Sequence, residues 1–165
     1  MSIQEGDLNF DFSGASDVIK FDDGRTHVKS SIKPVDFVIE YPDFYRFVEV
    51  KDPDVPGASK IGAFEEKLKS GELIQGLARK YRDSIFFHRF QNHTHKDIEY
   101  IVLLSMRALD DAQLLTITDQ LQKSIPWSHQ SWGETKSASA CVILNMTQWK
   151  KCFGNNSVWR RGEAP

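Results

Sequence analysis

The sequence contains only two cysteines, Cys141 and Cys152, which are too few for a disulfide scaffold. No apolar run approaches the length of a membrane-spanning helix, which is about 18 residues. Met1–Phe10 is too polar for a signal peptide. No glycine-rich phosphate loop and no serine-hydrolase elbow is present. These absences argue against a secreted, membrane-spanning, P-loop or serine-hydrolase protein, and a cytoplasmic location is the default expectation.

An excess of charge of one sign is also missing, because the formal net charge is −2 and the pI is near 6.2. A polyanionic partner would therefore have to bind a local patch. Residues 1–58 carry twelve acids and six bases, whereas residues 59–107 carry six acids and nine bases. This distribution suits a metal site beside an anion-binding face, and chance unevenness in a small domain explains it equally well.

The composition fits one globular domain with a substantial core, since 40% of the 165 residues are hydrophobic and 12% are aromatic. We place this domain at residues 1–153. Residues 154–165, "GNNSVWRRGEAP", lack the spacing of core residues, and we interpret them as a mobile tail.

The hydrophobic spacing predicts a mixed succession of strands and helices. Alternation predicts a strand over residues 8–12, and residues 13–21 fit either a short helix or a strand. We predict further strands over 35–41, 44–51, 99–106 and 139–146, and helices over 62–87 and from Asp110 or Asp111 to Lys123. Gly71 is a candidate break in the first helix. This order predicts an α/β protein with a mixed sheet and helices on its faces.

The stretch "KPVDFVIEYPDFYRFVEVKDP" (residues 33–53) places charged residues in two otherwise apolar strands. Proline suits the second position of a type I turn, here Tyr41-Pro42-Asp43-Phe44. This turn sets Asp36 directly opposite Glu49, on one face of the hairpin, and Lys51 projects from the same face. A bulge or a three-residue loop would instead put the two carboxylates on opposite faces.

Opposed carboxylates repel each other unless a cation lies between them. Lys51 supplies one positive charge, and a divalent ion that prefers oxygen ligands would supply two more. Two interpretations therefore remain open at this point. The three residues form either a metal site or a solvent-facing salt bridge.

The residues "PVD" (Pro34–Asp36), followed after twelve positions by "EVK" (Glu49–Lys51), resemble the signature of the PD-(D/E)XK nuclease superfamily. The resemblance covers residues 17–106, and it implies a restriction-endonuclease-like fold. In that fold a mixed β-sheet is flanked by helices, with an α-β-β-β-α-β core, here extended by a C-terminal helix and strand. The resemblance further implies a nuclease that hydrolyses phosphodiester bonds, with DNA as the expected partner.

The resemblance assigns Asp36 and Glu49 as ligands of Mg²⁺ or Mn²⁺, with the backbone carbonyl of Val50 completing the set. It assigns Lys51 to positioning the attacking water and stabilising charge on the phosphate. A metal ion lowers the pKa of bound water, and a facing cation stabilises the transition state. We expect Lys51 to act electrostatically, because a lysine between carboxylates retains its proton.

The chain departs from the family pattern at two places. Members often carry another acid on a first helix, for which Asp22 or Asp23 is the best candidate here and Glu5 a more distant one. RecB-like members carry a glutamine and a tyrosine four residues apart, whereas Arg79 stands four residues after Gln75. Gln75, Arg79 and Arg82 share one helix face, which fits either a phosphate track or a solvated surface.

Two further expectations concern metals and partners. The pair His93 and His95 has the His-x-His spacing that can bind zinc, but no nearby cysteine or third well-spaced ligand completes a tetrahedral set. We therefore interpret His88, His93 and His95 as part of a polar loop. A nuclease this small would act as a homodimer or through a targeting partner protein, with no membrane association. The alternative is a nuclease-like fold that has lost catalysis and serves as a binding or regulatory subunit.

Overall fold

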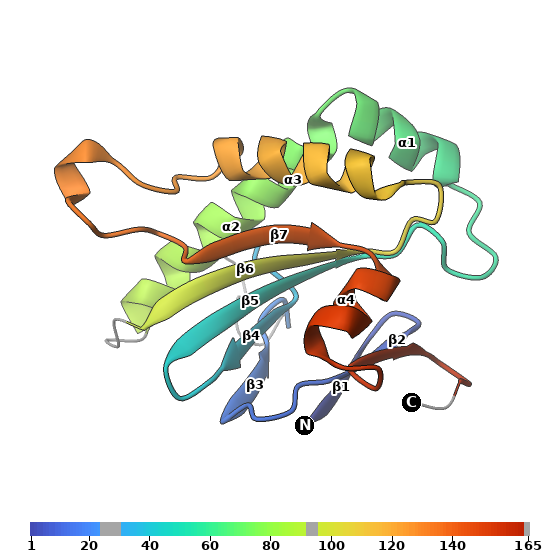
Figure 1. Cartoon of the computed structure of the whole chain (residues 1–165), viewed down its shortest axis with the longest axis horizontal. Helices are drawn as coiled ribbons and strands as arrows, with labels where there is room; N and C mark the ends of the chain where they lie inside the picture. Colours follow the sequence, from blue (N-terminus) through green and yellow to red (C-terminus); the bar gives the residue numbers. More distant parts are fainter. Residues whose placement is uncertain (24–30, 92–95, 164–165) are drawn as a thin grey trace.

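A computed structural model describes residues 1–23, 31–91 and 96–163 of the chain. It has two β-sheets and four α-helices in these ranges (Figure 1). The strands are β1 (Ser2–Glu5), β2 (Leu8–Asp11), β3 (Asp17–Lys20), β4 (Phe37–Glu40), β5 (Phe44–Lys51), β6 (Asp97–Leu104), β7 (Ala140–Leu144) and β8 (Val158–Arg160). The helices are α1 (Ile61–Lys69), α2 (Glu72–Gln91), α3 (Asp111–Ser124) and α4 (Met146–Phe153).

The larger sheet has the strand order β3-β4-β5-β6-β7. Strand β4 pairs in antiparallel fashion with both β3 and β5, and a short turn joins β4 to β5. Strands β5, β6 and β7 are parallel, and helices supply the crossovers between them, as parallel pairing requires. The α/β class and the mixed sheet expected from the sequence are confirmed.

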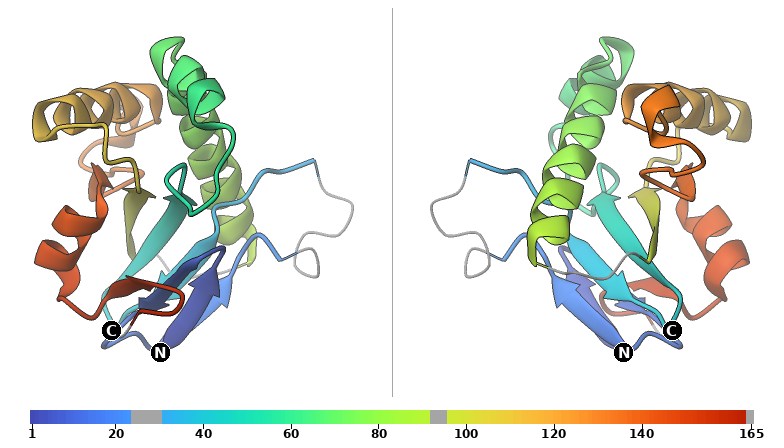
Figure 2. Two further views of the ribbon diagram at one scale, coloured as in Figure 1. Left: turned by 90° about the vertical axis from the view of Figure 1, so that its right-hand side faces the viewer. Right: turned by 90° about the vertical axis from the view of Figure 1, so that its left-hand side faces the viewer.

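Helices α1, α2 and α3 lie on one face of this sheet, and α4 lies on the other face with the small sheet (Figures 1 and 2). The alternation along each strand divides the core into two clusters. Val38 and Phe47 pack toward α2 and α3. Phe37 and Val48 pack instead with Trp149 of α4. The strands are therefore apolar on both sides, and a charged residue within them is a local exception.

The small sheet has the order β1-β2-β8 and is antiparallel. It corrects the expectation for the end of the chain, because β8 pairs with β2 and Val158 is fully buried. A three-residue strand is too short to show a period, so its pattern could not be recognised in the sequence. The domain therefore includes part of residues 154–165.

The structure also corrects the expected order at the start of the chain. The α-β-β-β-α-β core requires a helix before the first sheet strand, but described residues 1–23 contain β1, β2 and β3 and no helix. The ambiguous segment 13–21 forms the strand β3, which pairs with β4 along its whole length. The polar residues that left this segment ambiguous lie on an exposed edge strand.

The helices follow the predicted spacing closely. Gly71 divides the first helical segment into α1 and α2, and its φ of +80° is the left-handed conformation that glycine adopts readily. Asp110 caps α3 by accepting a hydrogen bond from the Gln113 amide, and the Gln113 side chain accepts one in return from the Asp110 amide. No described helix has both the length and the apolar character needed to cross a membrane.

Candidate metal and phosphate site

The β4–β5 hairpin has the register that the Pro42 turn predicts. The Tyr41 amide donates to the Phe44 carbonyl at 2.9 Å, and Phe37 pairs with Val48. One step farther along this ladder, Asp36 lies across from Glu49. Because the side chains alternate, both carboxylates face the side of the sheet that α2 covers. The predicted register of the hairpin is therefore confirmed, and it agrees with the placement predicted for Asp36 and Glu49.

Both carboxylates are withdrawn from solvent, since Asp36 is 5% exposed and Glu49 is 0% exposed. Asp36 is fixed by the Val50 amide, which donates to its Oδ2 atom at 2.6 Å. Val50 thus contacts Asp36 through its N–H group. A buried pair of like charges is costly unless cations and hydrogen bonds compensate it.

Two lysines provide this compensation. Lys51 donates to Oε1 of Glu49, as expected for a neighbour on the same strand face. Lys80 of α2 lies 2.9 Å from Oε2 of Glu49 and 3.4 Å from Oδ1 of Asp36. Two ammonium groups thus oppose two carboxylates, and Lys80 bridges the pair.

The surroundings shift the proton equilibria of this cluster. Burial raises the pKa of the Glu49 carboxyl and Asp36 raises it further, while Lys51 and Lys80 oppose the rise. Burial acts to lower the pKa of the Lys80 ammonium, but Glu49 and Asp36 together bring that pKa above its usual value. Lys80 therefore remains a cation at neutral pH and serves as a fixed positive charge.

The sequence reasoning missed Lys80. A signal was present, because Lys80 follows Leu73 by seven residues and Leu77 by three, on the apolar stripe of the helix. A charged residue at such a position either extends to solvent or meets a buried partner. Only the packing of α2 over the hairpin shows that the buried carboxylates are its partners.

A second group of carboxylates adjoins the first. One oxygen from each of Glu5, Asp22 and Asp36 lies within 4.8 Å of the other two. Asp22 follows β3, and Glu5 ends β1. The structure thus brings Asp36 together with Asp22 and Glu5, two of the three acids that were candidates for a further ligand. Among the described residues, this group consists of these three acids and does not include Glu49.

The electrostatics of this second group fit a cation. Burial raises the pKa of the Asp22 carboxyl, and Asp36 and Glu5 raise it further. Lys20 lies 2.7 Å from Oε2 of Glu5 and compensates part of the negative charge. Three carboxylates are oxygen donors of the type that Mg²⁺ and Mn²⁺ bind. Glu5, Asp22 and Asp36 could therefore hold such an ion, with Asp36 shared between the two groups.

The polar face predicted on α2 is exposed. Gln75, Arg79 and Arg82 are all exposed, and Arg79 pairs with Asp83 at 3.6 Å. Phe86 and Phe90 continue the same helical spacing with exposed rings, whose centroids lie 4.8 Å apart. This stripe on α2, consisting of Gln75, Arg79, Arg82, Phe86 and Phe90, combines positive charge with exposed aromatic surface.

The histidines do not form a zinc site in the described residues. His88 is buried in α2 between the rings of Tyr45 and Phe47, with centroid distances of 4.5 Å and 5.2 Å. Its placement corrects the expectation of a polar loop at this position. His93 and His95 lie outside the described residues.

Comparisons with protein-family models, with curated proteins and with solved structures find no match to this chain. The assignment of a function therefore depends on the geometry of the site.

Proposed function

We propose that the protein is a metal-dependent nuclease of the PD-(D/E)XK type, which hydrolyses phosphodiester bonds of DNA. The observation that carries the proposal is the convergence of Asp36, Glu49 and Lys51 in register on one hairpin, beneath Lys80. The antiparallel β3–β5 unit, followed by helices and the parallel strand β6, supports a restriction-endonuclease-like fold. The strands that replace the first helix make this fold a variant.

In this proposal Asp36 holds a divalent ion, with further oxygens from Glu49 or from Glu5 and Asp22. The carbonyl of Val50 is a candidate ligand as well, because the N–H and C=O groups of one strand residue face the same neighbour, and the Val50 amide faces Asp36. Bound Mg²⁺ or Mn²⁺ would supply a water nucleophile of lowered pKa and polarise the phosphate. The donor set contains only oxygens, which fits these hard ions.

The lysines would stabilise the negative charge that develops on the phosphate during hydrolysis. Lys51 is part-exposed, with 31% of its side chain accessible, so its ammonium can reach a phosphate while it remains near Glu49. Lys80 is less accessible, at 23%, and lies between the two carboxylates. We assign Lys51 to the substrate and Lys80 to balancing the charge of Asp36 and Glu49.

The stripe on α2 would guide the nucleic acid toward this site. Arg79 and Arg82 supply positive charge for phosphates. Phe86 and Phe90 offer exposed rings on which unpaired bases can stack. The stripe extends from Gln75 to Phe90, which is sixteen residues of helix or about 22 Å, long enough for several nucleotides.

Cleavage of labelled nucleic acids tests the proposal. Single-stranded, duplex and branched DNA and RNA are incubated with wild-type protein in Mg²⁺ or Mn²⁺, and with EDTA as a control. Glu49→Gln and Lys51→Ala should each lose activity by 100-fold or more, in the range of removing one electrostatic group. Glu66→Gln, an exposed acid on α1, is the matched control and should cleave as wild type does. Wild-type cleavage that survives Glu49→Gln would overturn the proposal.

A second candidate function is a nuclease-like fold that binds a partner without cleaving. The two lysines favour this alternative, because Lys51 and Lys80 together already balance the charges of Asp36 and Glu49 without an ion. The two candidates differ in metal dependence. A non-catalytic subunit would show a melting temperature that Mn²⁺ does not change, whereas an ion that binds the folded state raises it.

A further inference from the structure

A cavity of about 440 Å³ lies directly beside the candidate site, in the connection from β5 to α1. One continuous stretch of chain, from Val50 to Phe64, supplies its lining residues. Lys51 belongs to both features, because it pairs with Glu49 and also lines the cavity. A group bound in the cavity would therefore adjoin a group bound at the carboxylates.

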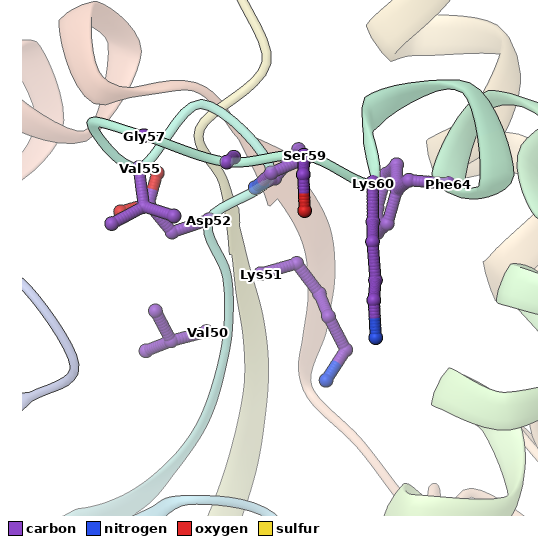
Figure 3. Close-up of a pocket in the computed structure, with 10 residues that line it drawn as sticks. Val50, Lys51, Asp52, Val55, Gly57, Ser59, Lys60 and Phe64 are labelled. Carbon is purple, nitrogen blue, oxygen red and sulfur yellow. The ribbon is translucent and has the colours of Figure 1, made fainter.

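Positive charge dominates the polar part of the cavity. Figure 3 shows the side chains of Lys51 and Lys60 extending to the same side of the loop, with the Ser59 hydroxyl between their stems. Lys60 is exposed and has no ion pair with any residue that the structure describes. Its ammonium is thus available to an anion from solution.

The one acid in the lining is already neutralised. Arg160 of β8 donates to both carboxylate oxygens of Asp52, each at 2.9 Å. This bidentate pair removes most of the negative field of Asp52 from the cavity. Of the two ammonium groups at the cavity, Lys51 is paired with Glu49, and Lys60 has no ion pair with a described residue. Lys60 is therefore the cation that an anion in the cavity meets without an opposing charge.

The remaining wall is apolar. Val55 and Ala58 come from the loop, and Phe64 comes from the second turn of α1, where it also packs against the core. The volume lies within the range of small-molecule sites, which combine apolar walls with a few fixed polar groups. Paired ammonium groups beside such a wall suit a ligand with a phosphate and a less polar body.

We propose that this cavity is a nucleotide subsite, which takes the nucleotide next to the scissile phosphate of the strand. The phosphate of that nucleotide lies between Lys51 and Lys60, and its sugar and base lie against Val55, Ala58 and Phe64. The proposal rests on the proposed function for the identity of the strand. It deepens that function, because it assigns Lys60 and the β5–α1 loop to positioning the substrate.

The first test measures the binding of deoxythymidine 5′-monophosphate to the metal-free protein by calorimetric titration. Wild type should bind the nucleotide, and Lys60→Gln should weaken this binding at least fivefold. Lys69→Gln is the matched control, since Lys69 is exposed at the far end of α1, nine residues or about 13 Å from Lys60. Inorganic phosphate should bind at least tenfold more weakly than the nucleotide, because it leaves the apolar wall uncovered. Equal affinities for phosphate and nucleotide, or no effect of Lys60→Gln, would overturn the subsite.

Steady-state cleavage of a short oligonucleotide is the second test. Lys60→Gln should raise KM about fivefold and change kcat less than twofold, because Lys60 positions the strand without touching the reacting atoms. The two proposals fail separately. If the wild type cleaves the oligonucleotide and Lys60→Gln has the same KM, the subsite is overturned and the proposed nuclease function is not affected. Nucleotide binding that depends on Lys60, in a protein that cleaves nothing, would support the cavity as a nucleotide site and overturn the nuclease.

Discussion

The Lys80 ammonium of α2 lies 2.7 Å from Oε1 and 2.9 Å from Oε2 of Glu49 in β5, and it joins the helix to the most buried carboxylate of the sheet. The pair links two residues that lie thirty-one positions apart in the chain. It also places a cation where opposed carboxylates would otherwise repel.

Glu49→Gln should abolish cleavage without lowering the stability of the protein at neutral pH. Burial and Asp36 raise the pKa of the Glu49 carboxyl even with Lys51 and Lys80 in place, so folding disfavours its charge. The neutral glutamine keeps the shape of the side chain and removes this charge. Urea denaturation measures the effect, and Glu66→Gln on the exposed face of α1 should unfold like wild type. A clearly lower midpoint for Glu49→Gln would mean that the contacts of the two lysines outweigh the cost of burying this carboxylate.

Lys80→Gln should lower the stability of the metal-free protein and increase its stabilisation by Mn²⁺. Without the ammonium, Asp36 and Glu49 repel each other, and a divalent ion relieves more repulsion than in wild type. For a chain of this size, about 1 kcal/mol corresponds to a shift of about 2–4 °C in melting temperature. Differential scanning calorimetry with and without Mn²⁺ measures both effects, with Lys69→Gln as control. A smaller Mn²⁺ shift in Lys80→Gln than in wild type would contradict the assigned role of Lys80.

The buried His88 should make the unfolding free energy decrease in mild acid. Burial, with a smaller effect from Arg89, lowers the pKa of His88 to about 4 in the folded state. A histidine in the unfolded chain has a pKa near 6.5, so between the two pKa values the unfolded chain binds a proton that the folded protein does not bind. The unfolding free energy should therefore decrease as the pH falls from about 6.5 to about 4, by roughly 3 kcal/mol in total.

Urea denaturation across this pH range, compared with His88→Phe, isolates the contribution of the histidine. The phenylalanine cannot titrate, so the variant should lose less stability between pH 7 and pH 4 than wild type does. Parallel pH profiles for the two proteins would show that His88 is not the group responsible.

Two glycines should respond to alanine in opposite directions. Gly71, between α1 and α2, has a φ of +80°, which alanine adopts only with strain. Gly76 lies within α2, and a methyl group there would meet no atom within 4 Å. Gly71→Ala should cost about 1 kcal/mol and Gly76→Ala should gain about 0.5–1 kcal/mol. Thermal denaturation of both variants checks the position of the helix break, which a stabilising Gly71→Ala would contradict.

The sequence was most informative where local chemistry determines geometry. Pro42 restricts the turn, the turn sets the register, and the register places Asp36 across from Glu49. The break at Gly71 and the cap at Asp110 could be recognised for the same reason. Each depends on a few neighbouring residues, whose backbone preferences are strong.

Contacts between distant segments could not be predicted in the same way. Glu5 reaches Asp22 and Asp36 only because β1 and β2 form a separate sheet, and β8 completes that sheet from the far end of the chain. Lys80 meets Glu49 only because α2 crosses the hairpin at one particular position. Nothing in the local sequence specifies such packing, so these residues emerge from the structure alone.

Binding of Mn²⁺ to wild type and to Asp36→Asn tests the central claim most directly, because Asp36 is the one carboxylate common to both groups at the site. Electron paramagnetic resonance of free Mn²⁺ measures the bound fraction without requiring activity. We predict one ion bound to wild type and an affinity at least tenfold lower for Asp36→Asn, with Glu66→Gln binding as wild type does. Equal binding by wild type and Asp36→Asn, or no binding by either, would contradict a metal site at these carboxylates.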